Sequence, residues 1–177
     1  MVEAPRQEEE TRPAAVLAVY TWDMLLAILA VFQALAPFAG AVVNSRGETV
    51  PLSLPVQILL ALSSAASAAT LIIVASLLTR RRRWVRLMQM VVMGVSIALA
   101  AISLLVDVLI GADLPLASVL LTLLILLLDL LALVLMTERR LVAWYREPGA
   151  PPRYITGTVL FWVLSGCAAI GLLAALR

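Results

Sequence analysis

Five apolar stretches, separated by short polar or charged segments, dominate this chain of 177 residues. They cover residues 24–43, 56–78, 87–111, 116–136 and 155–176. Each has the roughly 17 to 25 residues that a helix needs to cross a hydrocarbon core about 30 Å thick. Because 63% of all residues are apolar and only 14% are charged, a soluble fold is excluded.

The fold class that follows is all-α, a polytopic integral membrane bundle of five transmembrane helices. Helices are expected because backbone amides in lipid must be paired within one segment, and no alternation of period two points to a barrel. We expect an acidic cytoplasmic tail over residues 1–13, with four glutamates, and a single membrane domain over residues 14–177. The acidic charge of the tail is the wrong sign for a secretory signal.

Arginine positions predict how the bundle is oriented. All thirteen basic residues are arginines, and with five spans only Arg46 and Arg177 fall on the side opposite the tail. We therefore expect the N-terminus in the cytoplasm and the C-terminus outside, in a bacterial inner membrane. Aromatic rings prefer the membrane boundary. Those expected at the cytoplasmic boundary are Tyr20, Trp22, Trp84, Trp144 and Tyr145.

Small residues predict which spans pack in the interior, because helix association in lipid depends on close backbone approach. In the second span alanines recur every four residues at Ala61, Ala65 and Ala69. The fourth span has twelve leucines and is expected to face lipid or a partner. In the first span Pro37 is expected to kink the helix near its outer end.

Three aspartates in or near the spans, Asp23, Asp107 and Asp129, are the candidate polar or proton-binding positions. Asp23 is expected at the cytoplasmic interface and Asp107 about one turn from the outer end of its span. Asp129 is expected about 10 Å inside the fourth span. Two roles stay open for it, a hydrogen bond to another helix and a proton or cation relay. No arginine lies inside a span, which argues against a charge-paired translocation pathway.

Catalysis, cofactors and metals find no support in the residue pattern. The chain has no histidine and one cysteine, which excludes histidine-held haem, zinc sites, histidine general bases and intramolecular disulfides. No GxSxG motif or triad partner accompanies the serines. A net charge of +2 disfavours nucleic acid as a partner. We expect no enzyme, no cofactor and no metal site.

Two segments on the arginine-rich side are candidate interaction sites. Near an anionic leaflet each arginine contributes about 1 kcal/mol, so a basic turn is expected to hold acidic lipid headgroups. This turn comprises Arg80, Arg81, Arg82, Arg83 and Arg86. The segment 137–147 is expected to dock a partner through Leu141, Trp144 and Tyr145.

Together these features predict a small non-catalytic integral membrane subunit, scaffold or assembly partner of a larger bacterial membrane complex. Its expected partners are membrane lipids and other membrane-protein subunits or a second copy of the chain. The alternative is an oligomeric small transporter or channel subunit that uses Asp129. Five spans do not divide into two equal inverted halves and no internal repeat is visible, which disfavours the alternative.

Overall fold

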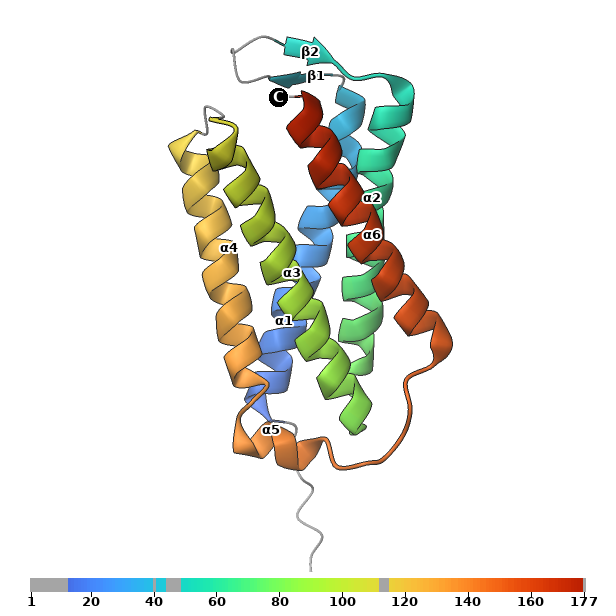
Figure 1. Cartoon of the computed structure of the whole chain (residues 1–177). Coiled ribbons are helices and arrows are strands. Elements are labelled where there is room, and N and C mark those ends of the chain that lie inside the picture. Colours follow the sequence, from blue (N-terminus) through green and yellow to red (C-terminus); the bar gives the residue numbers. More distant parts are fainter. Residues whose placement is uncertain (1–12, 40, 44–48, 112–114, 177) are drawn as a thin grey trace, which may run out of the picture.

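The computed structural model describes residues 13–39, 41–43, 49–111 and 115–176. Over these ranges the chain is a helical bundle with one short hairpin of strands (Figure 1). Five of its helices are long and apolar enough to cross a membrane. They are α1 (Ala14–Leu35), α2 (Leu54–Leu77), α3 (Arg83–Leu109), α4 (Leu116–Leu135) and α6 (Arg153–Leu176). The prediction of an all-α fold with five such helices is confirmed, and it fits a multi-pass membrane protein.

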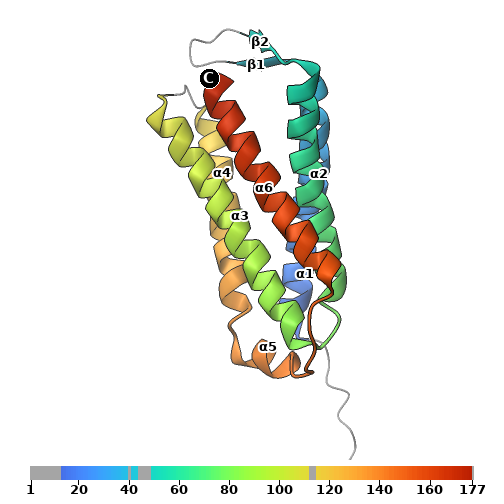
Figure 2. The ribbon, with the colours of Figure 1, turned by 45° about the vertical axis from the view of Figure 1, so that its right-hand side comes forward.

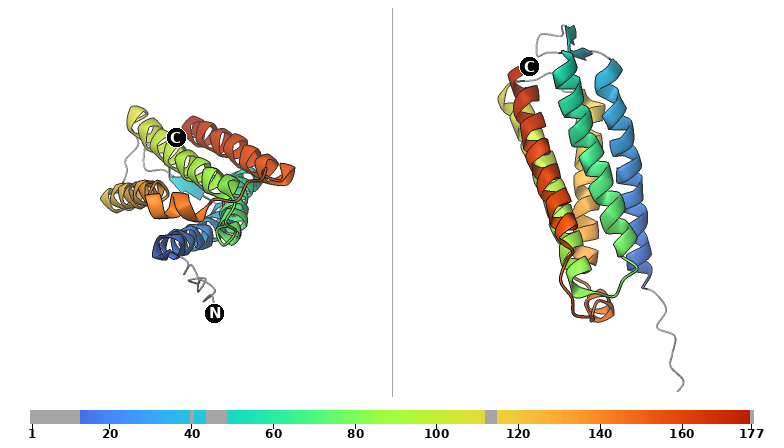
Figure 3. Two further views of the ribbon diagram at one scale, coloured as in Figure 1. Left: turned by 90° about the horizontal axis from the view of Figure 1, so that it is seen from below. Right: turned by 90° about the vertical axis from the view of Figure 1, so that its right-hand side faces the viewer.

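Short elements mark the two ends of the bundle. At the hairpin end, α1 continues into the 3-10 helix η1 (Ala36–Ala39), and β1 (Ala41–Val43) pairs antiparallel with β2 (Thr49–Pro51). At the opposite end the short helix α5 (Arg139–Trp144) lies across the bundle (Figure 3). We call this the arginine-rich end, because every arginine that the structure describes lies there. These nine are Arg80, Arg81, Arg82, Arg83, Arg86, Arg139, Arg140, Arg146 and Arg153.

The long helices form two groups that Figure 2 shows side by side. In one group α2 packs against both α1 and α6, and in the other α3 and α4 form an antiparallel hairpin. The turn of that hairpin begins at Gly111, whose φ of 68° is a left-handed conformation that glycine adopts without steric cost. Further contacts join α3 to α2 and α6, and α4 to α1. The α4 helix therefore touches the rest of the bundle along one side.

The first helix differs most from the sequence prediction. Its span was expected over residues 24–43, whereas α1 begins at Ala14, directly after Pro13, and ends at Leu35. Pro37 lacks the N–H group that an α-helix needs, so the chain tightens into η1 instead of continuing with a kink. The other four helices begin and end within four residues of the expected limits, and the largest shift is at the start of α3, Arg83 against 87.

Burial is concentrated in the half of the bundle nearest the arginine-rich end. The buried residues of α3 all lie in its first half: Trp84, Val85, Gln89, Val92 and Met93. In α4 the buried residues, Asp129 and Ala132, lie in the second half, which is the half nearest the same end. The outer halves of both helices, toward Gly111, contain no buried residue among those that the structure describes.

Small residues do line the interior, but not all of the expected ones. In α2, which packs against both α1 and α6, Ala68 is buried, whereas Ala65 and Ala69 of the predicted alanine row are exposed. In α6, a Cβ atom added at the buried Gly166 would lie 3.0 Å from Leu99 Cδ1 of α3. The absence of a side chain therefore allows α3 and α6 to approach closely at this point.

Candidate functional site

A cluster of polar side chains is buried where α1, α3 and α4 meet, in the half nearest the arginine-rich end. Asp23 and Gln89 are completely shielded and Asp129 is 1% exposed. Burying such groups is costly unless they are hydrogen-bonded, so each partner matters. We call this cluster the polar junction, and it consists of Trp22, Asp23, Gln89, Ser96 and Asp129.

Asp129 is hydrogen-bonded through both carboxylate oxygens. The indole Nε1 of Trp22 on α1 donates to Oδ1 over 2.7 Å. The hydroxyl of Ser96 on α3 donates to Oδ2 over 2.8 Å. One carboxylate thus connects three helices, which corresponds to the first of the two roles left open for Asp129, a hydrogen bond to another helix.

Asp23, the next residue of α1 after Trp22, has a different environment. The amide Nε2 of Gln89 on α3 donates to Asp23 Oδ2 over 2.7 Å. The other oxygen of each side chain, Asp23 Oδ1 and Gln89 Oε1, is buried without a hydrogen-bond partner among the described residues. The pair therefore retains two free acceptor atoms within the bundle.

The early start of α1 explains why Asp23 belongs to this site. Asp23 lies nine residues after Ala14, about 14 Å along the helix. Asp129 lies seven residues before Met136, about 10 Å from the same end. The two carboxyl groups therefore lie at similar depths, and Trp22, the neighbour of Asp23, reaches Asp129.

Sequence reasoning did not select three members of the junction. Trp22 was expected at the membrane boundary, and neither Gln89 nor Ser96 was a candidate. Gln89 and Ser96 are seven residues apart and so share one face of α3. A glutamine and a serine two turns apart on one face of an apolar helix are the signal that could have identified them.

Asp107, the third predicted acid, is not part of the junction. It lies two residues before the end of α3 and is half-buried. Eleven residues, about 16 Å of helix, separate it from Ser96. The structure therefore brings two of the three candidate acids into one cluster and leaves the third near the hairpin end.

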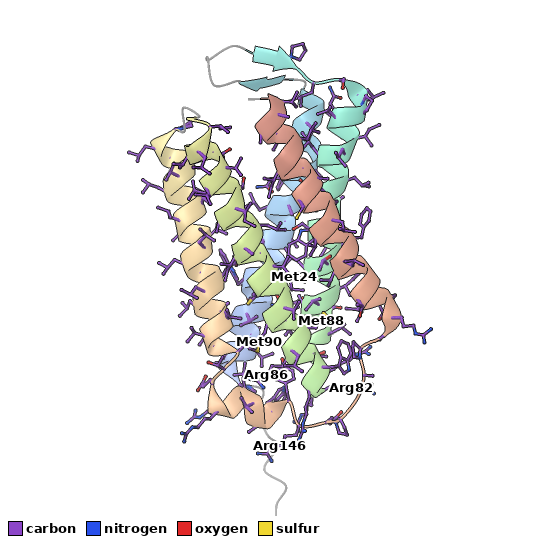
Figure 4. All side chains as sticks on the ribbon, viewed as in Figure 1. Met24, Arg82, Arg86, Met88, Met90 and Arg146 are labelled. Atoms are coloured by element: carbon purple, nitrogen blue, oxygen red, sulfur yellow. The ribbon has the colours of Figure 1, made fainter. Side chains whose placement is uncertain are left out.

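Two arginines of the basic turn contact other parts of the chain, and the other three are exposed. The guanidinium carbon of Arg81 lies 3.9 Å from the ring centroid of Trp144, a cation–π geometry. Arg86 Nε donates to the carbonyl of Met136 over 2.8 Å, at the carboxyl end of α4. The remaining members are exposed: Arg80, Arg82 and Arg83. Figure 4 shows Arg82 and Arg86 together with Arg146 at the arginine-rich end.

The segment expected to dock a partner instead packs against its own bundle. Leu141 is 0% exposed and Tyr145 is 2% exposed, and the Tyr145 hydroxyl donates to the carbonyl of Leu78 over 2.9 Å. Trp144 is half-buried under Arg81. Sequence hydrophobicity identified three side chains that require burial, and the bundle itself supplies the surface. The large apolar side chain that α5 leaves exposed is Val142.

Backbone hydrogen bonds fix the chain that follows α5. The N–H of Glu147 donates to the carbonyl of Arg81, and the N–H of Arg83 donates to the carbonyl of Glu147, each over 3.0 Å. These two bonds join the segment after α5 to the turn between α2 and α3. The arginine-rich end is therefore closed by a cap of α5 and the α2–α3 turn.

The arrangement ties three helices together and leaves two buried acceptor oxygens at the Asp23–Gln89 pair. No group of three cysteine, aspartate or glutamate side chains that could hold a metal occurs in the part of the chain that the structure describes. Comparisons with protein-family models, curated proteins and solved structures give no match to this chain. The fold and the site define a class, a five-helix bundle suited to a membrane with its polar groups paired across helices.

Proposed function

We propose that this chain is a small non-catalytic integral membrane subunit, scaffold or assembly partner of a larger membrane complex. The hydrogen bonding of Asp129 carries the proposal, because both of its oxygens accept from side chains of other helices. A carboxylate used in this way fastens α4 to α1 and α3 and is not presented to a substrate. Its role is to hold a scaffold together.

The partner surface that we propose is the outer face of α4. This helix makes its main contacts with α3 and α1, and many of its other side chains are large, apolar and exposed. Those more than two-fifths exposed are Leu116, Leu120, Leu121, Leu123, Leu124, Leu127, Leu130, Leu131 and Val134. With Leu141 and Tyr145 packed inside the chain, α4 remains as the proposed docking surface.

Photo-crosslinking in cells tests this surface. A photoreactive residue at Leu127 of α4 should give one discrete protein adduct, since this position is exposed and central on the face. The matched control is Leu62 of α2, which is also exposed but lies on another helix. Adducts to lipid alone at Leu127, or the same protein adduct at both positions, would contradict the proposal.

The proposed orientation places the arginine-rich end in the cytoplasm of a bacterial cell. It rests on the positive-inside rule, by which arginines in short loops stay on the cytoplasmic side of the membrane. All nine described arginines lie at this end. Reporter tags fused to either terminus should report opposite compartments, with the N-terminal tag inside. Two tags in the same compartment would contradict both the orientation and the five-span topology.

A second candidate is an oligomeric small transporter or channel subunit that uses Asp129. It is favoured by the free acceptors Asp23 Oδ1 and Gln89 Oε1, buried beside a second carboxylate. Asp129→Asn should abolish proton-coupled flux in vesicles if this function is the correct one. Unchanged flux, or no flux from the wild type, leaves the subunit proposal in place.

A further inference from the structure

An apolar groove runs between α3 and α6 near the arginine-rich end. It has a volume of about 400 Å³. The α3 wall includes Leu87, Val91 and Val95, spaced by four residues, and the α6 wall includes Val159, Leu160 and Val163. Residues spaced by four form a row along a helix, so the groove runs parallel to the helices. From Trp84 to Val95 it follows about 16 Å of α3.

The groove opens on the outer surface of the bundle. Its rim residues Leu87, Val91 and Leu160 are each at least half exposed, whereas Val159 at its floor is buried. Thr156 is the lining residue with a hydroxyl group, and the other lining residues are apolar or aromatic. A groove of this composition matches a hydrocarbon chain and offers almost nothing to a polar ligand.

Arginines surround the end of the groove nearest the cap. Trp84 and Pro151 line this end. A Cβ atom added at Gly149 would lie 3.4 Å from Trp84 Cδ1 and 3.5 Å from Arg82 Nη1. The guanidinium of Arg82 therefore lies close to Trp84, at the end of the apolar lining. Arg153, the first residue of α6, lies one turn before Thr156.

Arg82 and Arg153 can bind an anionic ligand. Arg82 and Arg153 are exposed, and neither forms an ion pair with any carboxylate in the part of the chain that the structure describes. Guanidinium groups bind phosphate oxygens through charge-assisted hydrogen bonds. The apolar groove matches the acyl chain of a lipid, and the arginines at its end match the phosphate of the headgroup.

We propose that the groove binds one anionic phospholipid of the surrounding membrane. One acyl chain lies between α3 and α6, and the headgroup phosphate is held by Arg82 with Arg153. The net positive charge at this end selects anionic over zwitterionic headgroups. This inference does not depend on whether the chain is a subunit or a transporter.

Native mass spectrometry of the purified full chain tests the proposal. The protein is released from mixed micelles that contain phosphatidylglycerol and phosphatidylcholine with identical acyl chains. We expect one retained phosphatidylglycerol per chain. Arg82→Gln should weaken its retention about fivefold, since one arginine near an anionic surface contributes about 1 kcal/mol. Equal retention of both lipids by the wild type would overturn the proposal.

Arg140→Gln is the matched control for charge. Arg140 is exposed at the same end but lies on α5, outside the groove lining. It should leave retention unchanged, and an effect equal to that of Arg82→Gln would reduce the site to general surface attraction and overturn it.

Filling the groove tests the acyl-chain part separately. Val91→Trp should remove retention of phosphatidylglycerol, whereas Val134→Trp on the exposed face of α4 should not. A second measurement does not depend on whether the tryptophan variants fold. Phosphatidylglycerol with brominated acyl chains should quench Trp84, measured as the emission difference between the wild type and Trp84→Phe. Retention by Val91→Trp or absence of quenching contradicts the proposal.

Discussion

The two halves of this bundle are built from similarly apolar helices and yet pack differently. In the half nearest the arginine-rich end, α3 and α4 contribute buried residues, the polar junction joins three helices, and α5 closes the end. In the half nearest the hairpin, neither α3 nor α4 buries any of its described residues. Both halves of α4 are rich in leucine, so leucine content does not explain the difference.

The difference shows what holds helices together in a lipid environment. Lipid tails are as apolar as leucine, so leucine gains little by leaving lipid for another helix. Polar side chains and close contacts between small residues do favour association. In the tight half Asp129 accepts hydrogen bonds from two other helices, and near the middle of the bundle Gly166 allows α3 and α6 to approach closely. The outer half of the α3–α4 hairpin has polar residues too, Ser103, Asp107 and Thr122, but none of its described residues is buried.

The largest effect is expected for Asp129→Leu. It removes two hydrogen bonds and leaves Trp22 Nε1 and Ser96 Oγ without an acceptor. Inter-helix hydrogen bonds in membranes contribute about 0.6 to 1.7 kcal/mol each, so the free energy of unfolding should fall by roughly 2 kcal/mol. The measurement is reversible unfolding by SDS in mixed micelles.

Asp129→Asn is the conservative control for that variant. Its carbonyl oxygen can still accept from Trp22 and its amide can donate to the Ser96 hydroxyl, so the loss should stay within about 0.6 kcal/mol. If the leucine and asparagine variants are equally stable, hydrogen bonding does not fasten α4.

A somewhat smaller loss is expected for Gln89→Leu. The variant leaves Asp23, which is completely shielded, without its donor, so about 1 to 2 kcal/mol of unfolding free energy should be lost. Replacing both partners, as Asp23→Leu with Gln89→Leu, should recover most of this loss, because no polar atom of the pair then remains buried. A double variant less stable than the single one would mean that the pair stabilises the bundle in its own right.

The cap should contribute a smaller amount. Tyr145→Phe keeps the buried ring and removes the hydrogen bond to the carbonyl of Leu78, so the expected loss is about 1 kcal/mol. Limited proteolysis of the segment that follows α5 gives a second readout, since loosening of the cap should speed cleavage there. Unchanged cleavage together with unchanged stability would mean that contacts other than this hydrogen bond hold the cap in place.

The smallest effect is expected in the open half. Val108 lies near the end of α3 and is more than half exposed. Val108→Ala should therefore change the free energy of unfolding by less than about 0.5 kcal/mol. Val92→Ala on the same helix is the matched comparison, because Val92 is fully buried. Equal losses at the two positions would remove the contrast between the halves.

Hydropathy was sufficient to predict the number of long helices and the limits of four of them. It failed at α1 because the apolar run continues past Pro37 to Val43, and mean hydropathy does not register a missing N–H group. The residues before Met24 include Tyr20, Trp22 and Asp23, which lower the apolar signal where the helix in fact continues.

The polar junction could be predicted only in part. Asp23 and Asp129 stand out individually as acids among apolar residues. The two carboxyl groups lie at similar depths because of where α1 begins and which side of α4 packs against it. Neither of these can be deduced from a local sequence pattern. The same limit applies to Leu141 and Tyr145. Their hydrophobicity predicts burial, but only the tertiary arrangement decides whether the covering surface belongs to the same chain.

The two backbone hydrogen bonds between Glu147 and the α2–α3 turn bear on how the chain is assembled. Ribosomes deliver the spans in order, so the turn and the four preceding helices exist before the last helix emerges. Glu147 lies six residues before Arg153, so these two bonds limit where α6 can begin relative to the α2–α3 turn.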